Sequence, residues 1–275
     1  MRIILLGTGA ADYDMSLTCR CHTCTSVRRR GGRNVRTYAA ALVEPDLLID
    51  CGPTCYDRLR ALAQPPRVAH VVITHSHGDH CDAEALARIA HDFAPGGELR
   101  VYGNAASLEK LAADADVLGE LPPAEMEVLR EGKSRKVGRF TVLPLPANHS
   151  REHEETLIYV VGDPKARFLY GTDTAWPPDG AWELLAGAKL NLAIAEGTFG
   201  YLGAGEHPDL LTQHLNFEGA ERLMIELRER CILLPDSPFV LTHMSQHYVP
   251  PHDDIEADIA ARGMILGYDG MELDI

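Results

Sequence analysis

The sequence has 275 residues, 45% of them hydrophobic, and a formal net charge of −14. No stretch approaches the roughly 18 uninterrupted apolar residues of a transmembrane helix, and the apolar run Ile3–Leu6 is too short for a secretion signal. An acidic chain repels phosphate backbones, so we do not expect nucleic acid as a partner. With no low-complexity run, internal repeat or linker, we expect one cytoplasmic domain spanning residues 1–275 and large enough to bury its own core.

In chain order, short apolar runs bounded by Gly, Pro or Asp predict strands. They are Arg2–Leu6, Tyr38–Val43, Asp46–Ile49, His70–Thr74, Leu99–Tyr102, Phe140–Leu145, Thr156–Val161, Arg167–Tyr170, Leu190–Ala195, Phe239–Thr242 and Met264–Tyr268. Amphipathic stretches predict helices at Thr54–Ala63, Asp82–His91, Ala105–Asp114, Ala181–Leu185, Phe217–Arg228 and Asp254–Ala261. Asp82 is expected to cap its helix.

Tyr38–Val43 and Asp46–Ile49 are too close together for a helical crossover, so they must form a hairpin. Proline pairs at 65–66, 122–123, 177–178 and 250–251 indicate loops and not domain boundaries. The basic residues Arg28–Arg30, with Arg33 and Arg36, are interpreted as a solvated loop. We therefore expect an α/β fold in which two mixed sheets pack face to face with helices outside.

Four metal-ligating side chains follow the strand that ends at Thr74: His75, His77, Asp79 and His80. Alternate residues of an extended segment share a face, so the first two can bind one ion, while the next two serve a second. Imidazole with carboxylate suits Zn²⁺, Mn²⁺ or Fe²⁺. A histidine-rich surface loop is the alternative, but it would not explain the interleaved Asp and Gly.

Single polar residues also follow later strands, namely His149, Asp173 and His243. Each alone is more often a turn or cap residue. Together with the Thr74–His80 segment, they supply the further ligands that two ions require. The sequence thus predicts a two-ion site assembled from several strand ends.

This pattern resembles the metallo-β-lactamase superfamily, whose first motif, an Asp after a strand, matches Asp50. The resemblance covers nearly the whole chain and implies a four-layer αββα sandwich. Asp50 would orient the ligand loop. The implied ligands are His75, His77 and His149 for one metal, Asp79, His80 and His243 for the other, and Asp173 for both.

Three of the seven cysteines cluster at Cys19, Cys21 and Cys24. An odd number of cysteines argues against a disulfide framework, whereas three thiolates need one more ligand for a tetrahedral zinc site. His247, His22 and His214 are candidates. We favour His247, because His22 lies within the cluster, where the chain would have to fold very tightly. Three free thiols are the alternative.

The sequence resembles the carbon–phosphorus lyase accessory phosphodiesterases in three segments. These are Gly7–Ala10, the cysteine cluster that follows it, and Gly267–Glu272 near the chain end. That group implies a structural zinc bound by the cysteines and a later His, and often a homodimer. The usual His position is occupied here by Gln246, one residue before His247. The usual Gly-x-Pro before the cysteines is replaced by Asp12–Leu17.

Two ions about 3.5–4 Å apart activate a water molecule between them and clamp both oxygens of an in-line displacement, which suits phosphodiester hydrolysis. Asp173 and Asp79 are expected to support catalysis through the two ions. His214, which matches a His of the phosphodiesterase group, is a candidate general acid or phosphate contact; a polar residue at a helix start is the alternative. The resemblance implies opening of a cyclic phosphate, such as 5-phosphoribosyl 1,2-cyclic phosphate.

Other functions compete with a phosphodiesterase acting on a small substrate. A tRNA 3′-processing ribonuclease shares the Thr74–His80 motif, but would need a basic surface and an RNA-grasping arm, and this chain has no long Gly/Lys-rich insertion. A thioesterase, lactonase or β-lactamase would depend less on Asp79, His80 and His214. A metal-binding accessory protein without enzymatic activity would not need the complete set of ligands.

Overall fold

The first sheet contains both ends of the chain. The computed structural model describes residues 1–275 except 95, 97, 119–124, 204 and 206–207, so the predicted loop at Pro122–Pro123 lies outside the described residues. In spatial order the strands are β14 (Met271–Asp274), β1 (Arg2–Gly7), β2 (Ala40–Val43), β3 (Leu47–Ile49), β4 (His70–Val72), β5 (Arg100–Gly103) and β6 (Glu125–Val128). Pairings from β14 to β3 are antiparallel and those from β3 to β6 are parallel. The predicted hairpin is confirmed as β2–β3.

The second sheet repeats this pattern of pairing. In spatial order it contains β7 (Arg135–Val137), β8 (Phe140–Pro146), β9 (Leu157–Gly162), β10 (Arg167–Gly171), β11 (Leu192–Glu196), β12 (Phe239–Thr242) and β13 (Ile265–Leu266). The pairings are antiparallel from β7 to β10 and parallel from β10 to β13. Both sheets are seven-stranded, and both are mixed, which confirms the expected pair of mixed sheets.

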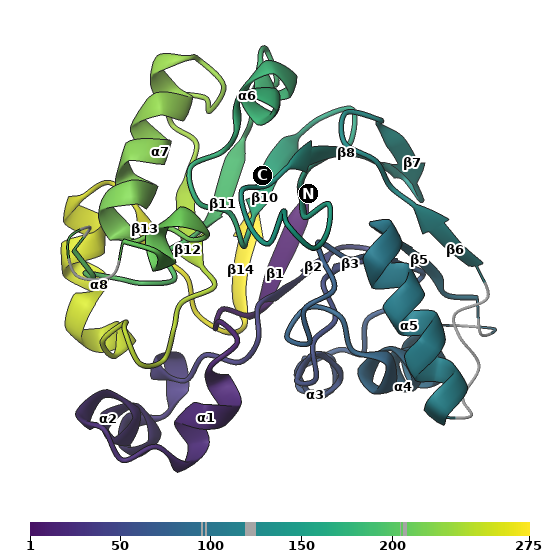
Figure 1. Ribbon diagram of the computed structural model, residues 1–275, viewed down its shortest axis with the longest axis horizontal. Helices are drawn as coiled ribbons and strands as arrows, with labels where there is room; N and C mark the ends of the chain where they lie inside the picture. Colours follow the sequence, from purple (N-terminus) through teal and green to yellow (C-terminus); the bar gives the residue numbers. More distant parts are fainter. Residues whose placement is uncertain (95, 97, 119–124, 204, 206–207) are drawn as a thin grey trace.

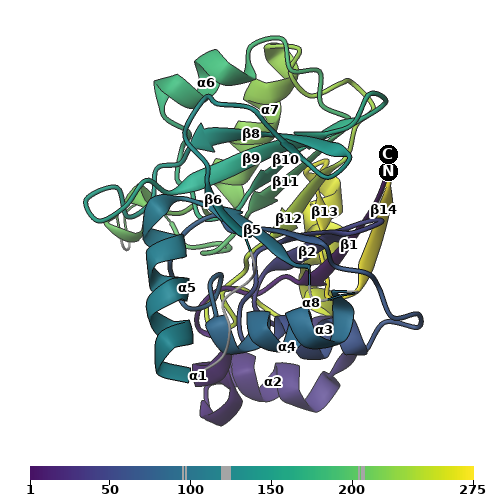
Figure 2. The same ribbon diagram turned by 90° about the vertical axis from the view of Figure 1, so that its right-hand side faces the viewer.

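Three apolar clusters hold the layers together. Leu47 and Ile49 of β3 face the second sheet and pack with Phe140 and Ile194, whereas Leu48 packs toward the helices. This division follows from the alternation of side chains along a strand. The outer face of the first sheet is covered by α3 (Cys55–Arg60), α4 (Ala83–Phe93) and α5 (Ala105–Leu118), and that of the second by α6 (Asp179–Leu185), α7 (Phe217–Glu229) and α8 (His252–Ala261). Figures 1 and 2 show the resulting αββα order.

Three strands were missed by the sequence reading: β6, β7 and β14. All three lie at sheet edges, with one neighbour each. At least half of the residues in Glu125–Val128 and Arg135–Val137 are exposed, and most of these are charged, so the strands carry little hydrophobic signal. The fourth edge strand, β13, was predicted as Met264–Tyr268 but is only two residues long.

The interpretation of Arg28–Arg30 as a loop is wrong. These residues form the last turn of α2 (His22–Arg30), which follows α1 (Tyr13–Thr18). Arginines suit this position because they face the negative end of the helix dipole. Arg30 also pairs with Asp254 at 2.6 Å, so this part of the basic cluster docks the segment onto α8.

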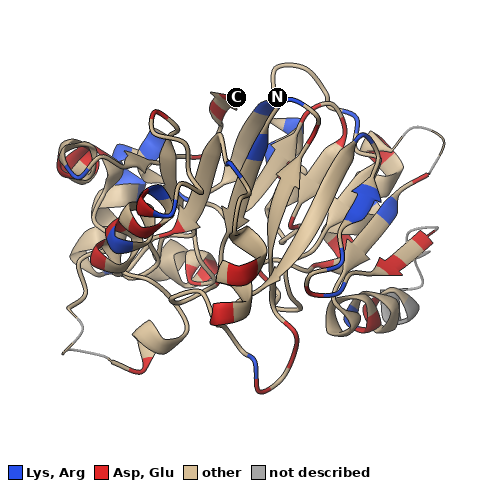
Figure 3. Cartoon of the chain, turned by 90° about the horizontal axis from the view of Figure 1, so that it is seen from above, with Lys and Arg blue, Asp and Glu red and all other residues tan. Residues whose placement is uncertain are grey.

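Charged residues are distributed over the outer surfaces. Figure 3 shows acidic and basic residues interspersed along the helices and edge strands. The Met1 amino group donates to the Ile275 carbonyl, so the two termini lie together in the first sheet. Among the described residues, no helix combines the length and apolar character needed to cross a bilayer.

Candidate metal centre

The candidate ligands converge because they follow different strands at one end of the two sheets. His75 follows β4, His149 follows β8, Asp173 follows β10 and His243 follows β12. The carboxyl ends of strands are the usual position of sites in α/β sheets. Asp173 and His243 both adopt positive φ, 52° each, a backbone conformation that non-glycine residues adopt at a cost and that clusters at functional sites.

The first group contains His75, His77 and His149, whose ligand atoms lie within 4.8 Å of one another. Nδ1 of His77 is 3.3 Å from Nε2 of His149. Nε2 of His75 is buried without a hydrogen-bond partner. Burial, reinforced by His80, holds the pKa of His75 well below its ordinary value. A neutral ring with a free, inward-pointing nitrogen is the form that binds a metal ion.

The second group contains Asp79, His80 and His243. Nε2 of His80 lies 3.1 Å from Asp79 Oδ2 and 3.3 Å from Nε2 of His243. All three side chains are buried. Two imidazole nitrogens and a carboxylate oxygen therefore lie close together.

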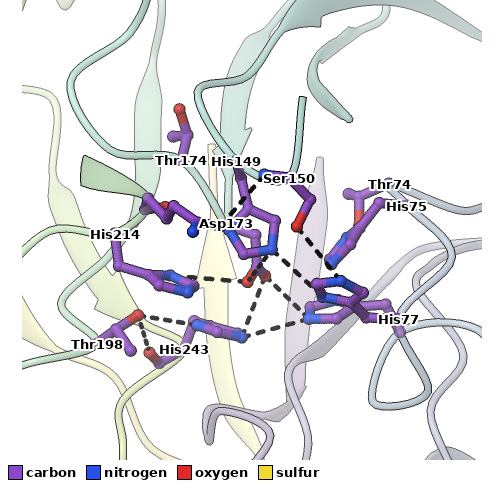
Figure 4. Close-up of polar contacts among 12 residues, drawn as sticks. Thr74, His75, His77, His149, Ser150, Asp173, Thr174, Thr198, His214 and His243 are labelled. Atoms are coloured by element: carbon purple, nitrogen blue, oxygen red, sulfur yellow. Dashed lines mark hydrogen bonds and ion pairs between the residues drawn. The ribbon is translucent and has the colours of Figure 1, made fainter. Parts of the chain in front are cut away.

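Asp173 lies between the two groups, as Figure 4 shows. Its Oδ2 is 2.9 Å from Nε2 of His80 and 3.1 Å from Nε2 of His243. Its Oδ1 is 3.8 Å from Nε2 of His149, which belongs to the first group. Burial would raise the pKa of Asp173, but His243 and His80 hold it well below its usual range. The side chain is thus an ionised carboxylate with one oxygen toward each group.

Each of the five histidines directs its second ring nitrogen to a protein partner. The nearest partner atoms are Thr74 Oγ1 for His75 (3.1 Å), Ser150 Oγ for His77 (3.4 Å), Asp50 Oδ2 for His80 (2.9 Å), the Gln213 carbonyl for His149 (3.3 Å) and Thr198 Oγ1 for His243 (2.9 Å). Such outer contacts fix the tautomer and orientation of metal-binding histidines. The residues present therefore fit a two-ion centre.

Asp50 occupies the position expected from the resemblance. Its Oδ1 accepts hydrogen bonds from the backbone N and Oγ1 of Thr74, at 2.8 and 2.9 Å. Its Oδ2 contacts Nδ1 of His80, and the residue is completely buried. One carboxylate therefore supports both ends of the Thr74–His80 segment.

Glu196, at the end of β11, was missed by the sequence reading. It is completely buried, and both of its oxygens lie 3.2 Å from Nδ1 of His214. Burial alone would lower the pKa of His214, but Glu196, with Asp173 and Asp79, raises that pKa to about 9. The signal available in the sequence was a carboxylate directly after the predicted apolar strand Leu190–Ala195, the same kind of signal that identified Asp173.

The candidate ligands open into a pocket of about 470 Å³. His77, Asp79, His149, Asp173, His214 and His243 line its inner side. Its other side is built by α1 and by two loops, which contribute Asp12, Met15, Phe199 and Tyr248. The segment that replaces the usual Gly-x-Pro is therefore part of the pocket wall.

The cysteine cluster lies beside this pocket. Nδ1 of His247 is 3.8, 3.9 and 3.5 Å from the sulfurs of Cys19, Cys21 and Cys24. Of the three candidates for the fourth ligand, His247 is therefore the one that lies with the cysteines. His214 lies elsewhere, against Glu196. Gln246 presents its backbone carbonyl to Cys24, at 3.9 Å.

Residues 46–244 match the family described as the beta-lactamase superfamily domain. This match covers more than half of the sequence, so the chain belongs to the metallo-β-lactamase superfamily. No curated protein matches the sequence.

Similar solved structures span the whole chain at low identity. One is a diphosphatase from the PhnP family, with 20% identity, a TM-score of 0.74, and coverage of 100% of this chain and 97% of that chain. Zn²⁺-bound PqqB from Methylobacterium extorquens has 17% identity and a TM-score of 0.75, with 100% of both chains covered. Human tRNase Z, short form, has 20% identity and a TM-score of 0.67, covering 100% and 99%. At these identities the similarity shows the fold alone. With the buried His and Asp clusters, family membership identifies a metal-dependent hydrolase.

Proposed function

We propose that this hydrolase is a phosphodiesterase that converts a small phosphodiester, such as a cyclic phosphate, to a phosphomonoester. The observation that carries the proposal is the position of Asp173, with one carboxylate oxygen toward His80 and His243 and the other toward His149. A carboxylate in this position is suited to bridging two ions. Bound there, Zn²⁺ or Mn²⁺ would lower the pKa of a water molecule and neutralise charge that develops on a phosphate.

The protein's own residues would then orient the reacting groups. Asp79, His80 and His243 would hold one ion, His75, His77 and His149 the other, and Asp173 would set their separation. His214 lines the same pocket, and its Nδ1 lies 3.8 Å from Asp173 Oδ1. Glu196 holds Nδ1 of His214, so Nε2 would be available to contact a phosphate oxygen or to protonate the leaving oxygen. A proton donor at this position favours a reaction that expels an alkoxide.

We further propose that Cys19, Cys21, Cys24 and His247 hold a structural zinc ion. Three sulfurs and one imidazole are a usual ligand set for closed zinc sites. The cluster is partly exposed and lies in a segment of short helices, where a metal would supply stability that a small local core does not. His247 and pocket residue Tyr248 are adjacent, so this ion would also fix part of the pocket wall.

The test is hydrolysis of bis(p-nitrophenyl) phosphate by protein incubated with Zn²⁺ or Mn²⁺, with metal content measured on the same sample. We expect turnover that requires added metal, and binding of two ions beyond the structural zinc. Absence of turnover with every metal, together with absence of bound metal, would overturn the proposal. Bound metal without turnover would instead favour a metal-binding accessory protein.

A further inference from the structure

The outer wall of the pocket, unlike the inner wall of ionisable side chains, carries several apolar side chains beside the carboxylate of Asp12. Met15 and Tyr248 line it while remaining 64% and 43% exposed, and Phe199 lies deeper at 8%. Ala10 and Ala11 are further apolar residues that line the pocket. Large apolar side chains left open beside convergent polar groups are typical of ligand-binding pockets. We call Met15, Phe199 and Tyr248 the apolar wall.

Aromatic rings connect the candidate metal centre to this wall. The ring of His214 lies 4.6 Å from that of His149 and 5.5 Å from that of Phe199, between centroids. The ring of Phe199 lies 5.2 Å from that of Tyr248, with the planes at 89°. A phosphate bound at the centre would therefore place one of its ester groups along a continuous row of rings. Edge-to-face and stacked contacts make such a surface favourable for another flat ring.

The charges in the pocket indicate what does not bind there. Its described lining residues include the carboxylates Asp12, Asp79 and Asp173, but neither Lys nor Arg. Proteins usually recognise phosphate groups with those two cations. Asp12 is fixed in the outer wall, because its Oδ2 accepts from Ser245 Oγ at 2.7 Å and from the His247 backbone at 3.1 Å. A second phosphate on the substrate would meet this carboxylate and the apolar wall.

We infer that the substrate is a phosphodiester with a single phosphate group, one ester substituent of which carries an aromatic ring that packs on the apolar wall. This inference rests on the proposed phosphodiesterase activity and narrows its substrate class. It disfavours sugar phosphates with a second phosphate, including 5-phosphoribosyl 1,2-cyclic phosphate. One member of the apolar wall, Met15, comes from the segment in which this chain departs from the usual Gly-x-Pro.

Binding of two stable phosphonates to the metal-loaded protein tests whether the substrate carries an aromatic ring that packs on the apolar wall. We expect phenylphosphonate to bind about tenfold tighter than methylphosphonate by titration calorimetry, because its ring removes apolar area from water. Met15→Ala and Tyr248→Ala should each reduce that ratio severalfold. Leu17→Ala is the matched control, since Leu17 lies on the same short helix, is 50% exposed and is not among the pocket-lining residues; its ratio should equal that of the parent.

Hydrolysis of ribose 1,2-cyclic phosphate with and without a 5-phosphate tests whether the substrate has a single phosphate group. The reacting bond is the same in both compounds, so only the second phosphate differs. We expect the 5-phosphate to lower kcat/KM by about tenfold, since it meets the Asp12 carboxylate and no Lys or Arg among the described lining residues. Equal affinity for the two phosphonates, or a higher kcat/KM with the 5-phosphate, would overturn the inference while bis(p-nitrophenyl) phosphate is still hydrolysed. Failure to hydrolyse any phosphodiester with any metal would overturn the phosphodiesterase proposal and the inference together.

Discussion

Nδ1 of His214 lies 3.2 Å from both carboxylate oxygens of Glu196, whose side chain is completely buried at the end of β11. The same carboxylate accepts hydrogen bonds from the backbone of Thr174, at 2.6 Å, and of Leu215, at 2.9 Å. Thr174 follows Asp173, and Leu215 follows His214. Glu196 therefore fixes the position of His214 relative to the carboxylate that lies between the two groups of candidate ligands.

Glu196→Gln should lower kcat about 100-fold while changing KM little, because a misplaced proton donor affects the transition state more than binding. The amide offers one acceptor oxygen and turns an NH₂ group toward protein donors. Steady-state kinetics with bis(p-nitrophenyl) phosphate measures this effect. Adding His214→Ala to Glu196→Gln should lower kcat little further, since each change disables the same Glu196–His214 pair. Glu221→Gln, in a partly exposed pair with Arg262, is the control. A Glu196→Gln variant with parental kcat would contradict the role given to Glu196.

Asp173→Ala should abolish turnover and leave about one active-site metal ion bound, because it removes the carboxylate shared by the two groups. Elemental analysis of the purified variant, with protein concentration measured on the same sample, gives the metal ratio. Asp57→Ala removes a carboxylate with 69% side-chain exposure that pairs with Arg88 at 3.7 Å, and should keep the parental metal content and activity. Full activity of the Asp173 variant would rule out the two-ion mechanism.

Cys21→Ser should lower the melting temperature by about 5 °C, because metal binding contributes directly to folding free energy. The active-site metal content should change less than the stability does. Differential scanning calorimetry measures the first and elemental analysis the second. Cys231→Ser is a suitable control, since Cys231 is also exposed but lies outside the cluster. If the Cys21 variant melts at the parental temperature, the cluster is not a structural zinc site.

The thiol of Cys21 should be unusually reactive in chelator-treated protein. The pKa of the Cys21 thiol is lowered to about 6. The largest cause is the hydrogen bond that its sulfur accepts from the backbone N–H of Cys24, and His247 lowers the pKa further. The reactive thiolate should therefore predominate above pH 6, and its alkylation rate should level off near pH 7. Peptide mapping after iodoacetamide treatment at several pH values, with Cys231 as internal reference, checks this. Zinc should protect Cys21 but not Cys231; a rate for Cys21 still rising steeply at pH 8 would contradict the shifted pKa.

The sequence was most informative where structural signals are local. The strands at the centre of each sheet are continuous apolar runs, so β3, β9 and β11 were predicted within a residue or two of their bounds. The edge strands β6, β7 and β14 were missed because at least half of their residues are exposed and many of these are charged. The helices α1 and α2 were missed for a related reason: they are short, and their polar sequences show no apolar periodicity.

The sequence by itself determined the type of site, since the spacing of His75, His77, Asp79 and His80 is set by the geometry of one extended segment and turn. Only the tertiary structure decided what surrounds these ligands. Glu196 faces His214, and Met15 faces the pocket, because strands and loops far apart in the chain meet where the two sheets end. Such contacts depend on strand order and sheet packing, which leave no fixed spacing in the sequence to reveal them.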